Sequence, residues 1–384
     1  MSLATISAAD VTRQLSSFHT VIDARSPAEF TEDHLPGAVN WPVLDNDERR
    51  TVGTEHKQVS AFDARKIGAA MIAQRIGDLL QAHVQDKPRD WQPLVYCWRG
   101  GKRSGTLAWF LDQIGFRTTL VQGGYKAFRE QVREQLASLP LSFDYVVIAG
   151  RTGSGKTRLL QALADAGAQV LDLEGLARHR GSVLGGLPHE PQPTQKAFET
   201  QLWSALSAFD PSRPVYVESE SRKIGQLQVP SALLDRMRSD GRVVMVTMPD
   251  ASRIELLVEE YGFFAEQVER FCGHLETLVD LRGRETVKHW QTLARDGRWA
   301  EVFGALMRAH YDPLYLKSMQ RNYAGVAGAS QVLLRDASPA ALGEAAAAVL
   351  ALEAVARAPD SALAAGPSFD TLCVPCSEPV EGSG

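Results

Sequence analysis

The sequence predicts an α/β protein with two successive parallel-sheet domains and a helical C-terminal extension. Short apolar segments alternate with segments of helical periodicity through most of the chain, and this alternation is typical of parallel strands joined by helices. Beyond about Ile254 the spacing of apolar residues becomes mainly helical. The predicted boundaries are 1–138 for the first domain, 139–358 for the second domain with its extension, and 359–384 for a disordered tail.

In the first domain, short apolar runs predict four strands, at 19–23, 37–42, 94–97 and 119–122. A helix is expected to begin at Ser26, where a proline and an acidic residue follow the serine. A longer helix over 68–85 places Ile72 and Ile76 on one face, and another covers 105–114. Strands separated by helices in this way indicate a parallel sheet.

The second domain begins after the polar, proline-bearing segment 138–142. Its strands are predicted at 143–149, 170–173, 215–218 and 243–247, with a further candidate at 331–334. The segment 143–149 is rich in β-branched residues, which favour strands. Helical stretches separate these strands, so we expect a second parallel sheet.

Composition and charge limit the class of protein. The 384 residues include 41 basic and 46 acidic side chains, a net charge of −5. This charge excludes binding to nucleic acid through overall positive charge, although a local basic groove stays open. The start has no secretory signal pattern, and no stretch approaches the roughly eighteen apolar residues of a membrane span. Since four cysteines are too few for a disulfide scaffold, we expect a cytoplasmic protein whose thiol chemistry is catalytic.

A phosphate-binding loop follows the strand predicted at 143–149. The fixed positions of the motif G-x-x-x-x-G-K-[ST] are Gly150, Gly155, Lys156 and Thr157, and Gly153 adds flexibility inside the loop. Its backbone N–H groups are expected to surround phosphate oxygens at the start of a helix. The lysine would reach the outer phosphate and the threonine could ligate Mg²⁺. Nothing in the sequence selects ATP over another diphosphate or triphosphate.

Two glutamates lie at the end of the strand predicted at 215–218. Glu218 is placed to hold Mg²⁺ through water, with Glu220 as a competitor. The alternative is that both residues merely flank the strand end. No metal site is certain, and Mg²⁺ is compatible with the chain rather than required by it.

A cysteine loop follows the strand predicted at 94–97. Cys97 is separated by five residues from Arg103, and a helix comes next. The residues between them that form the predicted anion loop are Arg99, Gly100, Gly101 and Lys102. Such a loop can direct its N–H groups at a small anion, while the cations and the helix dipole favour a nucleophilic thiolate. The alternative, a buried structural cysteine, predicts apolar neighbours rather than two glycines and three cations.

The segments 23–30 and 34–40, with the cysteine loop, resemble the signature of rhodanese domains. In that family the cysteine carries a persulfide or a related chalcogen adduct. The loop is one residue longer than in the usual sulfurtransferase, and loops of this Cys-x5-Arg size occur in rhodanese-like phosphatases. The loop alone therefore leaves two functions open, chalcogen transfer and phosphate ester hydrolysis.

A rhodanese-like domain followed by a P-loop NTPase-like domain resembles the tRNA 2-selenouridine synthase family. The segments 172–182 and 218–225 match that family's pattern, and the resemblance covers roughly residues 10–350. It implies a transferase that acts on wobble 2-thiouridine in tRNA, first by S-geranylation from geranyl diphosphate and then by selenation from selenophosphate. Cys97 would carry the selenium as a selenosulfide, and the phosphate-binding loop would hold the diphosphate.

The resemblance also implies partners and further contacts. tRNA and a selenophosphate-supplying enzyme are the expected partners, and no tightly bound cofactor or membrane is expected. The candidate substrate or RNA contacts are His179, Arg180, Glu218 and Arg222, although a solvated loop also explains the first two. Cys373 and Cys376 form a C-x-x-C in the predicted tail, for which a dispensable segment is the simpler interpretation.

Two other functions stay open at this point. One is a cysteine-dependent phosphatase with a regulatory nucleotide-binding domain. The other is a nucleotide-switched sulfur-carrier protein that has no RNA chemistry of its own.

Overall fold

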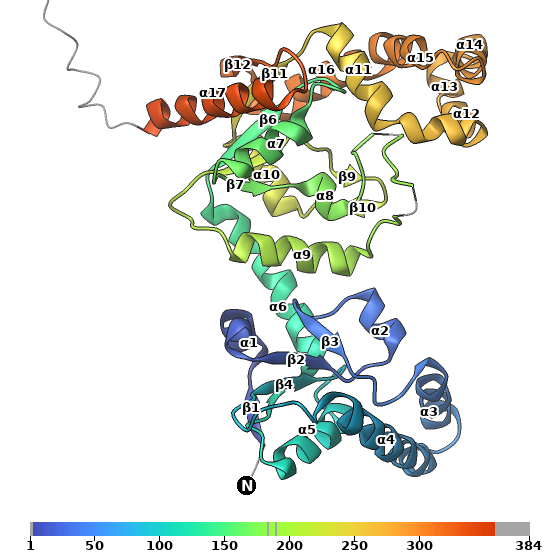
Figure 1. The fold of residues 1–384 in the computed structure, drawn as a ribbon, viewed down its shortest axis with the longest axis vertical. Helices are drawn as coiled ribbons and strands as arrows, with labels where there is room; N and C mark the ends of the chain where they lie inside the picture. Colours follow the sequence, from blue (N-terminus) through green and yellow to red (C-terminus); the bar gives the residue numbers. More distant parts are fainter. Residues whose placement is uncertain (1–2, 183, 189, 358–384) are drawn as a thin grey trace, which may run out of the picture.

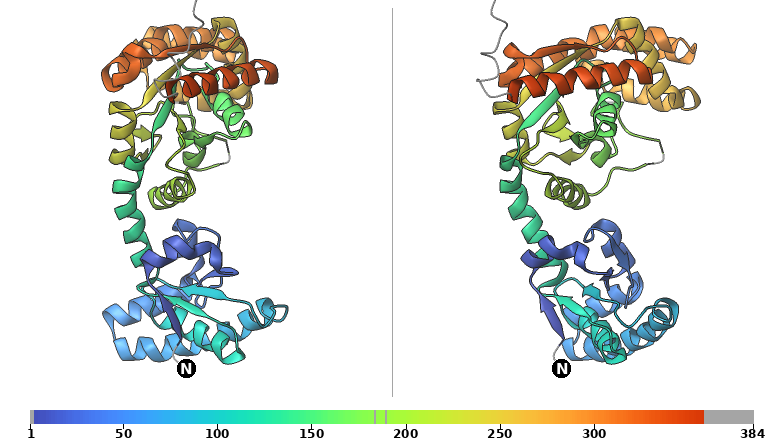
Figure 2. Two further views of the ribbon diagram at one scale, coloured as in Figure 1. Left: turned by 90° about the vertical axis from the view of Figure 1, so that its left-hand side faces the viewer. Right: turned by 60° about the vertical axis from the view of Figure 1, so that its left-hand side comes forward.

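A computed structural model describes residues 3–182, 184–188 and 190–357. The chain forms two α/β lobes stacked along the longest axis, and helix α6 (Gly124–Ser138) leads from the first lobe into the second (Figure 1). The turned views of Figure 2 also show α9 (Gln195–Ser207) on the side of the second lobe that faces the first.

The first lobe has a five-stranded parallel sheet in the order β1-β5-β4-β2-β3. Its strands are β1 (Ala4–Ile6), β2 (Thr20–Asp23), β3 (Ala38–Asn40), β4 (Pro93–Tyr96) and β5 (Thr119–Val121). The helices that connect them are α1 (Ala8–Gln14), α2 (Pro27–Glu32), α3 (Asn46–Gln58), α4 (Ala61–His83) and α5 (Lys102–Ile114). The central strand β4 is fully buried, and Cys97 follows its last residue.

The second lobe has a five-stranded parallel sheet in the order β12-β11-β6-β8-β7. Its strands are β6 (Tyr145–Ala149), β7 (Gln169–Leu171), β8 (Val215–Glu218), β11 (Arg242–Thr247) and β12 (Ser330–Leu333). A short antiparallel hairpin, β9 (Lys223–Ile224) with β10 (Leu227–Gln228), follows β8. The central strand β6 is buried at every position and leads directly into the phosphate-binding loop.

The helices of the second lobe fall into two groups. Those associated with the sheet are α7 (Lys156–Asp165), α8 (Leu173–Ala177), α9, α10 (Ser231–Ser239), α11 (Asp250–Glu260) and α17 (Pro339–Arg357). The extension consists of α12 (Val268–Glu276), α13 (Val279–Arg282), α14 (Arg284–Arg295), α15 (Trp299–Leu306) and α16 (Asp312–Asn322). Helices α12 to α15 gather beside α11 and surround their own apolar cluster (Figure 1).

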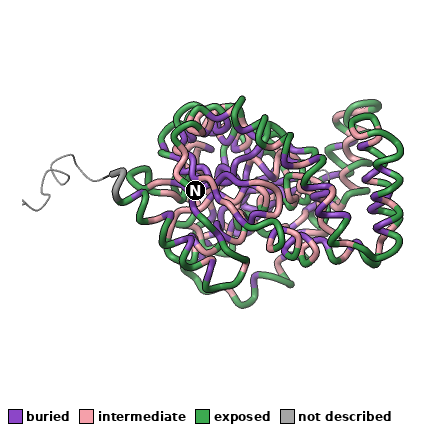
Figure 3. Tube along the Cα trace, turned by 90° about the horizontal axis from the view of Figure 1, so that it is seen from above, coloured by how far each residue is buried: buried purple, intermediate pink, exposed green. Residues whose placement is uncertain are grey.

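One hydrophobic cluster runs through both lobes. It contains Leu94 and Val121 of the first sheet, Phe128 of α6, and Val147 and Val215 of the second sheet. Seen from above, buried positions lie in the interior of the molecule while exposed ones follow the outer turns of the helices (Figure 3). Because α6 and α9 bury apolar side chains in this common cluster, burial of apolar surface holds the lobes together.

Polar contacts reinforce the same interface. The Asp33 carboxylate in the first lobe accepts hydrogen bonds from the Tyr125 hydroxyl at 2.8 Å and from the Thr200 hydroxyl of α9 at 2.9 Å. Lys196 of α9 forms a 2.6 Å ion pair with Glu32 at the end of α2. The position of α2 is therefore tied to the second lobe.

Every strand predicted from the sequence is present, with its ends displaced by no more than two residues. The helix predicted over 68–85 instead begins at Ala61, where the Ser60 side chain caps it, and the helix predicted over 105–114 begins at Lys102. Strand β1 and helix α3 were not predicted. Helix α3 has a single apolar residue, Val52, and therefore lacks the apolar stripe that reveals a helix.

None of the helices in the described ranges combines the length and apolarity needed to cross a membrane. The tail predicted at 359–384, with Cys373 and Cys376, lies outside the described residues.

Candidate active sites

The Cys97 thiol lies at the base of the loop between β4 and α5. Its side chain is buried among apolar residues of the first lobe. This environment agrees in part with the alternative of a buried structural cysteine, which predicts apolar neighbours. However, the sulfur also accepts a hydrogen bond from the Ser104 hydroxyl at 3.0 Å. Ser104 is fully buried and was not predicted as a site residue, although its place directly after Arg103 was visible in the sequence.

Close contact with α6 fixes the shape of the cysteine loop. Gly100 has a φ of +67°, and a Cβ there would lie 2.7 Å from the Val121 carbonyl oxygen. Gly124 has a φ of +58°, and a Cβ there would lie 2.2 Å from the Cys97 carbonyl oxygen. The same carbonyl accepts a 2.8 Å hydrogen bond from the Tyr125 N–H. Only glycine allows this approach of the two backbones, so the loop is held in one conformation.

The cysteine loop has donors available for an anion. Within the described part of the chain, the backbone N–H groups of 98–101 have no hydrogen-bond acceptor, and Gly101 is the N-cap of α5. Arg99 and Lys102 are exposed and form no ion pair with a described residue. Amide groups at a helix N-terminus, next to two cations, suit a small oxyanion.

Arg103 is directed at a protein carboxylate. Its guanidinium lies 2.6 Å from Glu29 of α2, and Arg49 of α3 approaches the same carboxylate at 3.7 Å. Burial disfavours ionised Glu29, but the hydrogen bond and charge of Arg103 outweigh it and lower the pKa of this carboxyl. Arg103 therefore connects the cysteine loop to α2, while Arg99 and Lys102 stay free for a ligand.

The phosphate-binding loop lies between β6 and α7. Gly153 and Gly155 have φ values of +76° and +75°, and Gly155 is the N-cap of α7. The Lys156 ammonium donates to the Gly150 carbonyl at 2.8 Å and lies 5.5 Å from the Tyr315 ring centroid. Its ammonium therefore lies over the loop that the motif predicts to receive phosphate.

Three carboxyl groups gather beside this lysine. The Thr157 hydroxyl donates to Glu174 at 3.1 Å, and the Glu174 N–H donates to Glu218 at 2.7 Å. Burial raises the pKa of Glu218 well above its ordinary value, and its second oxygen has no partner among the described residues. Burial and the neighbouring Glu174 raise the pKa of Glu220 to about 8. Glu174 was not predicted as a site residue, although it lies within the segment 172–182.

The oxygen atoms of these side chains are the candidate ligands for the expected Mg²⁺. The described residues include no cluster of three or more histidine, cysteine, aspartate or glutamate side chains arranged around a common point for a metal. Mg²⁺ in phosphate sites needs only one or two protein oxygens, with substrate phosphates supplying others. The Thr157 hydroxyl and the Glu174 carboxylate fit that limited role.

A cavity of about 490 Å³ opens beside the phosphate-binding loop. Among the residues that line it are 152–158, Glu174, Arg180, Glu220 and, from the helical extension, Tyr311 and Tyr315. Arg180 donates to the Glu260 carbonyl and lies over the Tyr261 ring. The predicted contacts Arg180 and Glu218 therefore lie at or beside this cavity. His179 packs against the hairpin at Gly225, and Arg222 is exposed; neither lines the cavity.

Helix α11 and the helical extension support the phosphate-binding loop. Arg253 of α11 is fully buried and donates to the Thr152 carbonyl at 2.7 Å and to Asp312 of α16 at 2.6 Å. The Tyr315 hydroxyl of α16 accepts from the Gly150 N–H at 2.7 Å. These supports come from positions more than 100 residues along the chain, so no local motif could reveal them.

The buried carboxyl cluster predicts a falling stability with rising pH. Between the ordinary glutamate value of 4.5 and the value of about 8 for Glu220, the folded state binds more protons than the unfolded state. Glu220 therefore contributes stability that is present below this window and is lost as pH rises through it. We expect the free energy of unfolding to be lower at about pH 8 than at about pH 5 by at least about 1 kcal/mol.

Glu220→Gln should flatten this dependence and stabilise the protein at the higher pH, and urea denaturation at both pH values measures the change. Glu130→Gln, which removes an exposed carboxylate on α6, is the matched control and should leave the slope intact. If the pH dependence of the free energy of unfolding is the same in Glu220→Gln as in the wild type, Glu220 is not the group that causes it.

Comparisons with known proteins place the chain in a family. A family model described as "Rhodanese-like domain" matches residues 7–131, and one described as "tRNA 2-selenouridine synthase AAA domain" matches 143–284. The tRNA 2-selenouridine synthase of Nitrosomonas europaea is 32% identical over 360 residues, which cover 81% of this chain and 92% of that protein. The chain belongs to the tRNA 2-selenouridine synthase family.

Other members of the family are similarly related. The tRNA 2-selenouridine synthase of Nitrosomonas eutropha is 33% identical, over 78% of this chain and 88% of that protein. That of Bdellovibrio bacteriovorus is 30% identical, over 80% of this chain and 90% of that protein. The family resemblance and the fold class predicted from the sequence are therefore confirmed, with a rhodanese-like domain first and a P-loop-type domain second.

Proposed function

We propose that this protein converts the wobble 2-thiouridine of tRNA to 2-selenouridine in two steps. The observation that carries the proposal is the presence, on one chain, of two anion-binding loops of different kinds. One surrounds a buried thiol, and the other opens into a cavity of about 490 Å³. The names of the relatives agree with a selenium-transferring tRNA enzyme.

The first step is S-geranylation. The sulfur of 2-thiouridine attacks C1 of geranyl diphosphate, the C–O bond breaks, and diphosphate leaves with the electron pair. Lys156 and the N–H groups of the phosphate-binding loop stabilise the charge that develops on the leaving diphosphate. S-alkylation makes C2 of the base electrophilic and turns the sulfur into a departing thiolate.

The second step replaces sulfur with selenium, and Cys97 carries the selenium as a selenosulfide. Water cleaves the P–Se bond of selenophosphate, which gives phosphate and selenide. Joining selenide to the Cys97 thiolate removes two electrons, which a low-molecular-weight disulfide accepts. The terminal selenium then attacks C2, and geranylthiolate leaves with its electron pair. A thiol then attacks the Cys97 sulfur, the Se–S bond breaks, and the selenium of the nucleoside leaves with the electron pair. A second thiol releases Cys97 from the resulting mixed disulfide, so the two thiols together supply two electrons and leave as a low-molecular-weight disulfide.

The proposal includes the partners expected from the sequence. tRNA is the substrate, and an enzyme that makes selenophosphate supplies the selenium donor. No tightly bound cofactor is needed, and Mg²⁺ at Thr157 would help to hold diphosphate. A cytoplasmic location fits these substrates.

Purified protein and an anticodon stem–loop containing 2-thiouridine test the proposal. With geranyl diphosphate alone, mass spectrometry of the nucleosides should show S-geranyl-2-thiouridine. Addition of selenophosphate with thiol and disulfide should convert it to 2-selenouridine. Hydrolysis of an aryl phosphate without any change in the nucleoside would favour the phosphatase, and no chemistry on either substrate would favour the sulfur carrier.

A further inference from the structure

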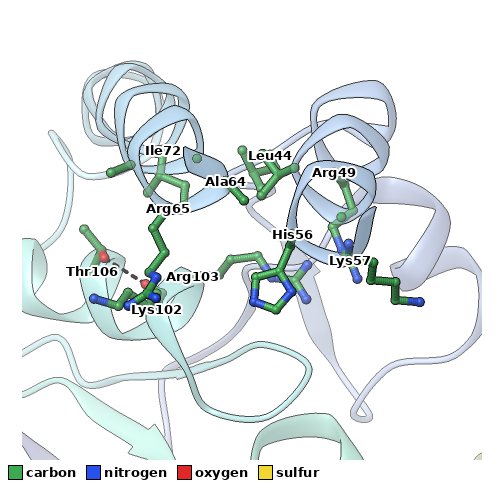
Figure 4. A pocket seen from close by; sticks show the side chains of 14 residues that line it. Leu44, Arg49, His56, Lys57, Ala64, Arg65, Ile72, Lys102, Arg103 and Thr106 are labelled. Carbon is green, nitrogen blue, oxygen red and sulfur yellow. Dashed lines mark hydrogen bonds between the residues drawn. The ribbon is translucent and has the colours of Figure 1, made fainter. Parts of the chain in front are cut away.

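A second cavity, of about 390 Å³, lies in the first lobe beside the cysteine loop. Helices α3 and α4 form two of its walls, and the beginning of α5 forms the third (Figure 4). Its volume is within the range of small-molecule sites. The P-loop cavity of the second lobe shares none of its lining residues.

The floor of this cavity is apolar. Figure 4 shows the side chains of Leu44, Ala64 and Ile72 between the two helices, and these residues belong to the core of the first lobe. Gly68 of α4 faces Val52 of α3 so closely that a Cβ would lie 3.3 Å from the valine side chain. A ligand with an apolar body therefore finds a preformed hydrophobic surface between α3 and α4.

The rim of the cavity is basic. The cationic or titratable residues around it are Arg49, His56, Lys57, Arg65, Lys102 and Arg103. None of the described residues that line the cavity is an aspartate or a glutamate. Glu29 pairs with Arg49 and Arg103, but Lys57, Arg65 and Lys102 form no ion pair within the described ranges. The rim therefore suits an anionic ligand, while the floor suits an apolar one.

Position connects this cavity to the chemistry at Cys97. Lys102 and Arg103 belong both to the cavity rim and to the loop that begins at Cys97. In the second step of the proposed function, C2 of the base must reach this loop. The sulfur on that carbon still carries a ten-carbon chain, which must lie close by.

We infer that the cavity between α3, α4 and α5 binds the apolar chain of the S-alkylated nucleotide during selenium transfer. The basic rim then faces the phosphates of the RNA, which gives the nucleotide a fixed orientation at the cysteine loop. This inference rests on the proposed function, because it assumes an S-alkylated base as the intermediate. The cavity would also retain the alkylated RNA between the two steps.

A substitution at the cavity wall tests the inference through the affinity for RNA, not through the rate of the reaction. Ala69 of α4 is exposed and lines the cavity, so Ala69→Trp fills the cavity without entering the core. Ala70→Trp is the matched control, because Ala70 is exposed on the same helix and does not line the cavity. Fluorescence anisotropy measures the affinity for two labelled stem–loops, one with 2-thiouridine and one with S-geranyl-2-thiouridine.

We expect the wild-type protein to bind the geranylated stem–loop at least about tenfold more tightly, since burial of two methylene groups already gives about this factor. Ala69→Trp should lose this gain while its affinity for the 2-thiouridine stem–loop stays within about twofold. Ala70→Trp should keep the gain. Equal affinities in the wild type, or a full gain in Ala69→Trp, would overturn the inference.

Two further measurements separate the possible failures. The KM for geranyl diphosphate in the first step should be unchanged in Ala69→Trp, and an increase would reassign the cavity to the diphosphate substrate and overturn the inference. Conversion of the geranylated stem–loop by wild-type protein tests the proposed function itself. A binding gain without conversion would remove the proposed function, and the role in selenium transfer with it, but would leave the cavity assigned to the S-alkyl chain. Conversion without a binding gain would overturn the inference and leave the proposed function standing.

Discussion

Cys97→Ser protein should produce S-geranyl-2-thiouridine at a nearly normal rate but form 2-selenouridine at least about 10³-fold more slowly. Serine has almost the size of cysteine, so the loop packed against α6 at Gly124 should keep its shape. A serine hydroxyl, however, does not ionise near neutral pH and forms no stable bond to selenium. The alkylated nucleoside should therefore accumulate, and mass spectrometry of the nucleosides measures both products.

Cys272→Ser is the matched control for this variant. Cys272 is also buried, but it lies on α12 in the apolar cluster of the helical extension, away from both anion-binding loops. Its replacement should reduce stability and leave both chemical steps intact in protein that is still folded. If Cys97→Ser forms 2-selenouridine at the wild-type rate, the sulfur at this position does not carry selenium.

Lys156→Ala should reduce kcat/KM for geranylation by about 10²- to 10³-fold, because one preorganised charge on the leaving diphosphate is lost. Selenation of a stem–loop that is supplied already geranylated should stay within about twofold of wild type, since Lys156 lies in the second lobe, outside the cysteine loop. Separate kinetic measurements with the 2-thiouridine and geranylated stem–loops give the two values.

Lys66→Ala is the control, because Lys66 is an exposed lysine of α4 that forms an ion pair with Asp63 and lies over the Phe62 ring. Wild-type geranylation by Lys156→Ala would remove the assignment of the phosphate-binding loop to geranyl diphosphate. Loss of both steps would mean that Lys156 is needed for folding or for RNA binding. Together, the Cys97 and Lys156 variants should therefore block different steps of one reaction.

Patterns of residues close together in the sequence were sufficient to predict most of the fold. They also predicted the loop at the centre of each candidate site. The central strands appear as short apolar runs because both sheets are parallel and these strands are buried at every position. The phosphate-binding loop and the cysteine loop have their essential residues within eight and seven positions of the sequence, respectively. Helix α3 escaped prediction because its polar sequence is stabilised by the cap at Asp45 and by packing on α4, not by an apolar stripe.

The partners of the site residues could not be predicted. Arg103 was predicted as a catalytic cation that favours the Cys97 thiolate, but the fold brings Glu29 within 2.6 Å of it across 74 positions of the sequence. Arg253 of α11 and two residues of the helical extension, Asp312 and Tyr315, hold the phosphate-binding loop. The pKa of Glu220 is raised only because folding buries it beside Glu174.

The sequence by itself determined the order of the two domains, all strands of the two main sheets except β1, and the positions of Cys97 and the phosphate-binding loop, because these depend on neighbours along the chain. Only the tertiary structure decided which charges are neutralised and where cavities form. Ion pairing and burial depend on distance in space, and the basic rim between α3, α4 and α5 comes from three segments that only folding brings together.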